Sequence, residues 1–242
     1  MQFQENELSL IYNWIAGKFQ QRKFLVLSLY IFTFAYLSVP SFTLPLLEYN
    51  RTRISSVMEQ RAIEKLLFFY PAQSWTGYSD INPNFMRSVV AMEDGRFFIH
   101  KGIDWEELEK SMQVNKKKRK MARGGSTITM QLSKNLFLRT DKNIFRKAKE
   151  LLITMRMEKE VGKKAILENY FNVVEWGDGI FGIGEAADVY YHKKPSELNI
   201  NESANLAAVI PSPLLHKPTD NSRYVRFRAS LIKARYNGVS LP

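Results

Sequence analysis

The chain has 242 residues, with 35 Lys and Arg against 24 Asp and Glu, and a net charge of +11. This basic balance predicts an anionic partner, which could be a nucleic acid, an anionic membrane surface or a phosphate-bearing substrate. The absence of cysteine excludes a disulfide framework and any cysteine metal site.

The first predicted element is an apolar segment, Phe24 to Leu47, which contains no charged residue. About 20 helical residues cross the hydrocarbon layer of a bilayer, so we expect a retained transmembrane anchor whose helix ends near Ser38. A cleaved signal peptide is disfavoured because no small-residue cleavage site follows, and a buried core helix is the other alternative. Residues 1–23 would then precede the anchor, and residues 48–242 would form a globular domain.

Two helices and a loop are predicted next. Residues 51–70 have the spacing of an amphipathic helix, and residues 73–84 have the composition of a loop. Helical spacing resumes from Phe85 to Met92, directly before a pair of acidic residues.

The most biased segment is the basic run Lys116–Lys120, which we interpret as a solvated loop that moves over the functional site. Contact with anionic lipid or substrate is a second interpretation. Nucleic acid is the weakest partner, because no zinc-finger, recognition-helix or RNA-binding aromatic motif accompanies the run.

Helices dominate the prediction from Ser126 onward. Ser126 can cap a helix with three apolar residues on one side, namely Ile128, Leu132 and Leu136. A second helix follows from i, i+3, i+4, i+7 spacing of Ala148, Leu151, Leu152 and Met155.

Gly162 predicts a break between that helix and another at residues 165–172. Asn199 with Glu202 is typical of a capping box before an apolar helix at residues 204–210. No segment alternates as a strand does, so the predicted fold class is mainly α.

Glu93 is the strongest candidate for a general base. A hydroxyl that attacks a sugar carbon must lose its proton, and a carboxylate with a raised pKa can accept it. The apolar residues 89–92 could raise that pKa. The alternative is an ordinary helix-end acid paired with Arg96. We expect His100 to close this acidic loop by a hydrogen bond.

A second carboxylate, Glu150, is flanked by four cationic residues: Lys134, Arg146, Lys147 and Lys149. One interpretation is a surface salt bridge, since Arg146 and Glu150 share a helix face. The other is that the cations hold a pyrophosphate, while Glu150 orients them or shares a divalent ion. Gly124 and Gly125, before a helix N-terminus, would let an anion approach backbone N–H groups. No residue cluster has zinc-site spacing.

These segments resemble the first three motifs of the peptidoglycan glycosyltransferases. The matching segments are Glu93-Asp94-x-x-Phe97-x-x-His100-x-Gly102, Gly124-Gly-Ser-Thr-Ile-Thr-x-Gln-Leu-x-Lys-Asn135 and Arg146-Lys-x-x-Glu150. Segments within residues 167–187 and 202–213 resemble the other two motifs, so the resemblance covers roughly residues 70–228. The Glu175-Trp-Gly-Asp-Gly-Ile-Phe-Gly182 variant is most similar to the monofunctional biosynthetic transglycosylases of Gram-negative bacteria.

The resemblance implies a lysozyme-like, mainly α-helical domain that acts on lipid II. Glu93 would deprotonate the 4-hydroxyl of the acceptor sugar, which attacks the anomeric carbon of the donor with inversion and releases undecaprenyl pyrophosphate. Glu150 would be the second catalytic carboxylate. Substrate binding would fall to Asp94, Ser126, Gln131, Lys134, Arg146 and Lys149. The resemblance implies no certain cofactor, and a requirement for Mg²⁺ or Mn²⁺ is left as an alternative.

The resemblance also implies a place in the cell inner membrane, with the N-terminus in the cytoplasm and the domain in the periplasm. Expected partners are lipid II, the growing glycan chain, the membrane and other cell-wall synthases or division proteins, and no nucleic acid. Met130 stands where the family usually has glutamine, which puts a polar contact there in doubt. Ser230-Leu-Ile-Lys233 fits a bare Ser-x-x-Lys pattern by coincidence, so we expect no transpeptidase activity.

Two alternatives from other classes stay open. A lytic glycan hydrolase of the same fold would cut glycan with a single acid, but it would not need the cations around Glu150. A catalytically inactive membrane scaffold of cell-wall synthesis would not need to retain both carboxylates.

Overall fold

The computed structural model describes residues 17–18, 20–34, 39–40, 42–49, 54–66, 73–119, 124–141 and 143–241. It divides into two units, residues 1–41 and residues 42–242. In the first unit residues 20–34 are helical, in agreement with a helix from Phe24 onward, while its predicted end near Ser38 lies outside the described residues. Within the described part of the chain, no helix is both long enough and apolar enough to cross a bilayer.

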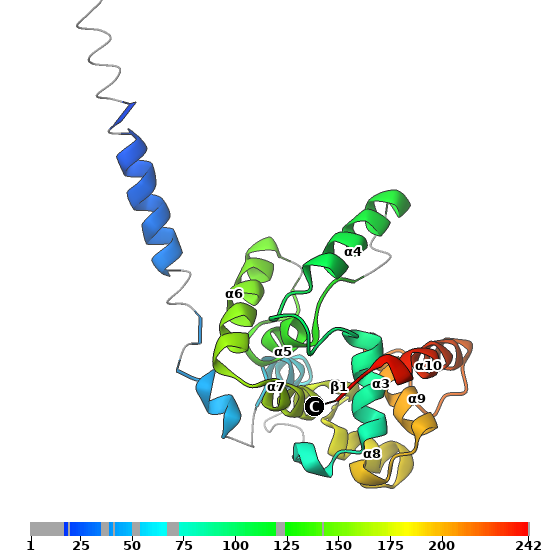
Figure 1. Cartoon of the computed structure of the whole chain (residues 1–242). Coiled ribbons are helices and arrows are strands. Elements are labelled where there is room, and N and C mark those ends of the chain that lie inside the picture. The colour runs from blue at the N-terminus through cyan, green and yellow to red at the C-terminus, as the bar shows by residue number, and fades with distance from the viewer. Residues whose placement is uncertain are drawn as a thin grey trace, which may run out of the picture. The chain divides into compact units, whose positions relative to one another are not determined.

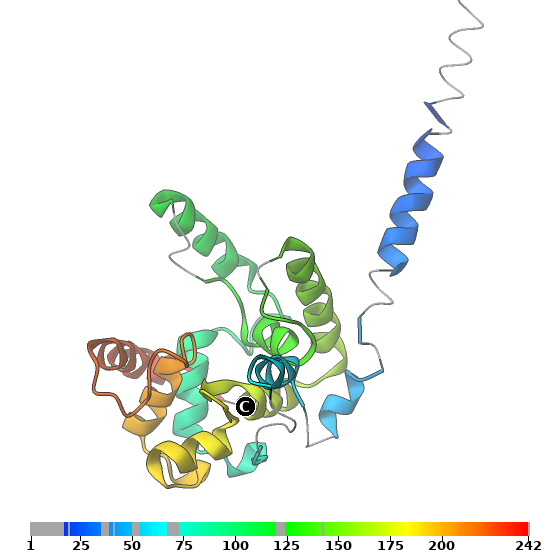
Figure 2. The same cartoon turned by 180° about the vertical axis from the view of Figure 1, so that it is seen from behind.

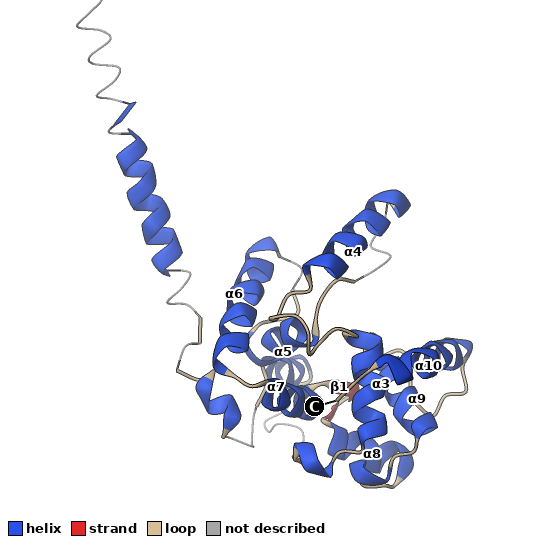
Figure 3. Ribbon diagram, viewed as in Figure 1, coloured by secondary structure: helices blue, strands red, loops and turns tan. Residues whose placement is uncertain are grey.

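The second unit is built of helices, as Figure 3 shows by colour. In chain order they are η1 (Pro45–Glu48), α2 (Ser56–Glu64), η2 (Tyr78–Asp80), α3 (Pro83–Glu93), α4 (Trp105–Lys118), α5 (Ile128–Phe137), α6 (Ile144–Glu160), α7 (Lys163–Val173), α8 (Ile183–Tyr191), η3 (Pro195–Glu197), α9 (Ile200–Val209), α10 (Arg223–Arg235) and η4 (Tyr236–Gly238). Between α7 and α8, β1 (Glu175–Gly177) and β2 (Ile180–Phe181) form an antiparallel hairpin. The mainly α prediction is confirmed.

The helices pack in two groups, which can be followed in Figures 1 and 2. In one group α3, α9 and α10 contact one another, and in the other α5 contacts α2, α6 and α7. Three fully buried aromatic rings join the groups. The ring centroid of Phe85 in α3 lies 5.2 Å from that of Phe171 in α7 and 6.0 Å from that of Trp176 in β1. Each such ring pair adds about 0.5–1.5 kcal/mol beyond its burial, so these contacts fix the spacing between the groups.

Local capping explains where several helices begin. The loop predicted at residues 73–84 ends at α3 because the Asn82 side chain accepts the Asn84 N–H at 2.9 Å. The capping box of Asn199 and Glu202 is confirmed at the start of α9. Gly162 separates α6 from α7, as predicted, and the helix predicted at residues 51–70 is the shorter α2.

The cap predicted at Ser126 is wrong by one residue. Thr127 is the N-cap of α5, because its Oγ1 accepts the Met130 N–H at 3.2 Å and donates to the Gly102 carbonyl oxygen at 2.5 Å. Ser126 is exposed instead. The acceptor on Gly102 lies far away in sequence, so local spacing could not distinguish the two hydroxyl residues.

The apolar stripe predicted on α6 forms a helix but does not cover a core: Ala148 and Met155 are exposed, and Leu151 and Leu152 are half-buried. The buried side chains of α6 are Glu150, Ile153, Thr154 and Met157. Ile144, Phe145 and Met155 are 80%, 81% and 47% exposed, and Ala148 is also exposed. The inner face is therefore the mixed polar one, which packs on α5.

The basic run is not the loop we predicted. Lys116, Lys117 and Lys118 form the last turn of α4, and Arg119 is its C-cap, while Lys120 lies outside the described residues. Cations in a last turn interact favourably with the helix dipole, which explains why the helix continues through the run. Figure 1 shows α4 extending away from α5 and α6.

Gly182, at the end of the hairpin, lies very close to the backbone of α7. Its φ is +82°, and a Cβ there would lie 2.8 Å from the Asn172 carbonyl oxygen. Gly182→Ala should lower the free energy of unfolding by about 2 to 5 kcal/mol, from left-handed strain and overpacking together. Gly179→Ala is the control, since its φ is +77° but its Cβ would meet nothing within 4 Å. Thermal unfolding measures both, and equal losses would contradict a role for the close approach.

Candidate active site

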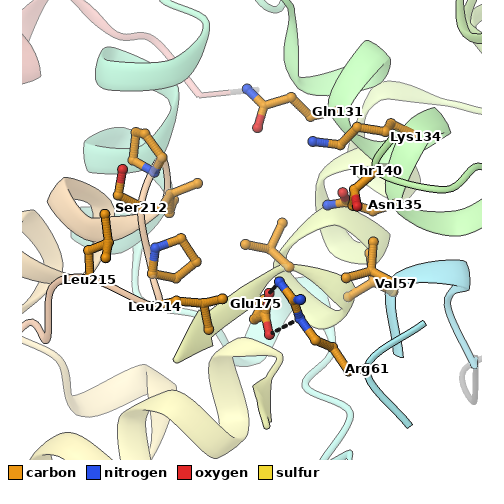
Figure 4. Close-up of a pocket in the computed structure, with 15 residues that line it drawn as sticks. Val57, Arg61, Gln131, Lys134, Asn135, Thr140, Glu175, Ser212, Leu214 and Leu215 are labelled. Atoms are coloured by element: carbon orange, nitrogen blue, oxygen red, sulfur yellow. Dashed lines mark hydrogen bonds and ion pairs between the residues drawn. The ribbon is translucent and has the colours of Figure 1, made fainter. Parts of the chain in front are cut away.

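Two adjoining cavities lie between the helix groups, with volumes of about 660 and 380 Å³. Glu93, Ser126 and Arg228 line the larger cavity, and Lys134 lines the smaller one. Gln131 lines both, so the cavities meet at α5. Figure 4 shows the smaller cavity, with Gln131 and Lys134 facing the loop that carries Ser212, Leu214 and Leu215.

Glu93 ends α3, and its side chain is only 11% exposed. The Gln131 Nε2 donates to its Oε2 at 2.9 Å, and the Arg228 Nη2 lies 3.7 Å from its Oε1. Burial raises the pKa of Glu93 above its usual range, although the Gln131 hydrogen bond and the Arg228 charge oppose that shift. A raised pKa is the property that a general base working near neutral pH needs.

The alternative pairing of Glu93 with Arg96 is not formed. The guanidinium of Arg96 lies against Glu106 instead, with its Nε 3.6 Å from Asp104. Arg96 is thereby held by the first turn of α4, and the Glu93 carboxylate is left facing the cavity.

Asp94 is bonded within the protein. Its carboxylate accepts the Ile128 N–H at 3.0 Å and the His100 Nε2 at 2.9 Å, which confirms the hydrogen bond predicted for His100. Because the Met130 N–H is bound to Thr127, two N–H groups of the first turn of α5 already have acceptors. The predicted anion cradle at this helix start is therefore wrong for those groups, and substrate contact by Asp94 stays a prediction.

Glu150 lies on the inner face of α6, with its side chain 3% exposed. One of its oxygens accepts from the Arg146 Nη1 at 2.5 Å and the other from the Lys147 Nζ, which also reaches the Ser126 Oγ at 3.2 Å. The salt bridge of Arg146 with Glu150 is thus formed, but its carboxylate is buried, whereas the Arg146 side chain is 19% exposed. Among the described residues Lys149 makes no hydrogen bond or ion pair, and it lines neither cavity.

The donor set around Glu150 does not fit a divalent metal ion. Both carboxylate oxygens are already paired with cations. In the part of the chain that the structure describes, no three His, Asp or Glu side chains gather as metal ligands. No step of the chemistry is therefore derived through Mg²⁺ or Mn²⁺.

Lys134 connects the two carboxylates electrostatically. Burial lowers its pKa from the usual value, Glu150 and Glu93 oppose that change, and the neighbouring Arg146 and Lys147 add to it. The charges of Glu93 and Glu150 both act on the ammonium group of Lys134, so Lys134 lies close enough to each carboxylate to interact with it.

Two residues of the site were missed by sequence reasoning. Arg228 on α10 donates from Nε to the Ala208 carbonyl oxygen at 2.9 Å, which aims its Nη2 at Glu93. Tyr170 on α7 donates its hydroxyl to the Gln131 Oε1 at 3.0 Å. Tyr170 lies within residues 167–187, which resemble a family motif, so that motif could have pointed to it. Nothing in the sequence around Arg228 indicated a role in the site except its basic character.

Comparison with known proteins gives one family. The family model described as Transglycosylase matches residues 59–237. A "Biosynthetic peptidoglycan transglycosylase" of Laribacter hongkongensis is 41% identical over 69% of this chain and 74% of its own length. Proteins of the same name from Janthinobacterium sp. and Nitrosospira multiformis are 42% and 36% identical, over 69% and 80% of this chain and 73% and 82% of theirs.

The burial of Glu93 predicts a stability that changes with pH. Its folded pKa is raised above the ordinary value of 4.5, so the folded state loses stability relative to the unfolded state as pH rises through that value and the folded pKa. Glu93→Gln removes this loss, and its melting temperature should exceed that of the wild type at about pH 8 but not at about pH 4. Glu59→Gln, at an exposed position of α2, is the control. A gain that is equal at both pH values would contradict the assignment.

Proposed function

The chain belongs to the transglycosylase family, and we propose that it polymerises lipid II into β-1,4-linked glycan strands with release of undecaprenyl pyrophosphate. The family match and the relatives' names make the chain a peptidoglycan glycosyltransferase. The observation that carries the proposal is a desolvated carboxylate, Glu93, in a cavity that adjoins Lys134 and its neighbouring cations.

Glu93 takes the proton from the 4-hydroxyl of the acceptor sugar. That oxygen then bonds to the anomeric carbon of the donor, on the face opposite the diphosphate, so the configuration inverts. The bond from the anomeric carbon to the diphosphate oxygen breaks, and its electron pair leaves with the lipid diphosphate. Lys134 and Arg146 stabilise the negative charge that develops there, because fixed cations in a desolvated site need no rearrangement.

The two faces of α6 support a lipid-linked donor. Arg146 and Glu150 lie on the inner face, whereas Ile144, Phe145 and Met155 are exposed on the outer face. A helix is about 10 Å across, so a diphosphate at the cations and a lipid chain along the outer face are compatible with one ligand. The protein would work at the periplasmic face of the inner membrane, anchored through residues 24–47, beside other cell-wall synthases.

A lytic hydrolase is the less favoured activity. A single acid suffices to cut glycan, so hydrolysis gives no reason to bury Glu150 with a cation on each oxygen. A transpeptidase activity is not proposed either, since Ser230 bonds the Phe227 carbonyl oxygen while Lys233 reaches Asn201.

Polymerisation tests the base assignment directly. The full-length protein with lipid II should lengthen glycan chains and should leave preformed glycan uncut. Glu93→Gln should lower the rate about 10²- to 10⁴-fold, the usual contribution of a general base. Glu59→Gln should match the wild type. Polymerisation by Glu93→Gln at the full rate, or shortening of preformed glycan, would remove this function.

The outer face of α6 gives a separate test. Phe145→Ser removes an 81% exposed apolar side chain and should lower the rate on lipid II in vesicles several-fold, with the thermal stability unchanged. Phe227→Ser is the matched control, because Phe227 is 61% exposed on α10. Equal effects of the two substitutions on the rate would show that the outer face of α6 does not meet the lipid.

A further inference from the structure

A hydrogen-bonded chain leads from the core to the general base. The Tyr170 hydroxyl on α7 donates to the Gln131 Oε1 at 3.0 Å, and the Gln131 Nε2 donates to the Glu93 Oε2 at 2.9 Å. Tyr170 is fully buried. Three helices that are distant in sequence, α7, α5 and α3, are thus linked by two bonds that end on the reacting carboxylate.

When Glu93 is ionised, the donors and acceptors of these two hydrogen bonds can be arranged in only one way. A carboxylate only accepts hydrogen bonds, so the Gln131 amide must turn its NH₂ group toward Glu93. The amide oxygen then faces Tyr170, whose hydroxyl must donate. In the described part of the chain the Gln131 side chain has no other hydrogen-bond partner. The Glu93 carboxylate and the Tyr170 hydroxyl are therefore the two groups that hold the Gln131 amide in this orientation.

We propose that Tyr170 is a positioning residue for the general base: its hydroxyl fixes the Gln131 amide so that the NH₂ end holds Glu93. The inference rests on the proposed function, because it needs Glu93 to act as the base. The proposed role depends on the hydroxyl of Tyr170 and not on its ring. A phenylalanine would fill the same space, since the surroundings include Phe171, whose ring centroid lies 6.0 Å away.

The hydroxyl is also a permanent donor. Burial and the neighbouring carboxylates Glu93 and Asp94 hold the pKa of Tyr170 well above its usual range. Tyr170 therefore keeps its proton at every pH at which the enzyme could work. Its hydrogen bond polarises the amide, which strengthens the second bond to the carboxylate.

Tyr170→Phe in the full-length protein isolates this effect. The kcat/KM for lipid II polymerisation at neutral pH should fall about 3- to 10-fold, the size of one hydrogen bond. The acid limb of the pH profile should move to higher pH, because a Gln131 amide that Tyr170 no longer holds bonds the charged form of Glu93 less well, which raises the pKa of Glu93. The rate should recover toward the wild-type value in alkaline buffer. A residue that only supports the core would lower stability without moving the limb.

A double-mutant cycle shows whether Tyr170 acts through Gln131. Gln131→Leu should move the acid limb in the same direction, and adding Tyr170→Phe to it should change nothing further. Tyr190→Phe is the matched control. Its hydroxyl donates to the Trp176 carbonyl oxygen at 3.1 Å, outside the chain to Glu93, so its profile should equal that of the wild type.

An unchanged profile for Tyr170→Phe, or losses that multiply in the double variant, would overturn the inference while leaving the proposed function intact. A wild-type protein that does not polymerise lipid II would instead remove the proposed function. If Tyr170→Phe does not fold, 3-fluorotyrosine at position 170 tests the same bond. Its hydroxyl is the stronger donor, so the acid limb should move to lower pH, and an unmoved limb would overturn the inference.

Discussion

The site depends on the bond from the Ile128 N–H to the carboxylate of Asp94. This bond, 3.0 Å long, ties the end of α3 to the start of α5. It places a negative charge at the positive end of a helix, where the dipole favours it. Glu93 precedes Asp94 by one residue, and Gln131 lies one helical turn after Ile128. The hydrogen bond of Asp94 to the first residue of α5 therefore brings Gln131 and Glu93 close to each other.

The two buried carboxylates have different surroundings, which suits them to different tasks. Glu93 receives one amide hydrogen bond, and its nearest cation stands 3.7 Å away. Glu150 has a cation bonded to each oxygen. A weakly compensated carboxylate can gain a proton, whereas a fully paired one holds its cations in place. Two cations of this basic chain thus surround Glu150, whereas Glu93 has the less compensated carboxylate that the proposed general base requires.

Helix α6 separates two environments. Its inner face presents Arg146 and Glu150, and its outer face presents Ile144 and Phe145 to solvent. An apolar helix face normally covers a core, so the opposite arrangement calls for a functional reason. The proposed substrate, with a charged diphosphate and an apolar chain, would supply one, because the two parts of such a molecule need these two environments.

The sequence by itself determined the mainly helical class, the break at Gly162, the capping box at Asn199 and the family motifs that single out Glu93 and Glu150. These signals act within about one helical turn or repeat a family pattern, so they can be recognised without coordinates. Tertiary structure alone decided that Thr127 rather than Ser126 caps α5, that Ala148 and Met155 of the predicted α6 stripe are exposed, and that Arg228 and Tyr170 belong to the site. The reason is physical: each depends on a partner from a distant part of the chain, and local spacing carries no information about which face or atom that partner will meet.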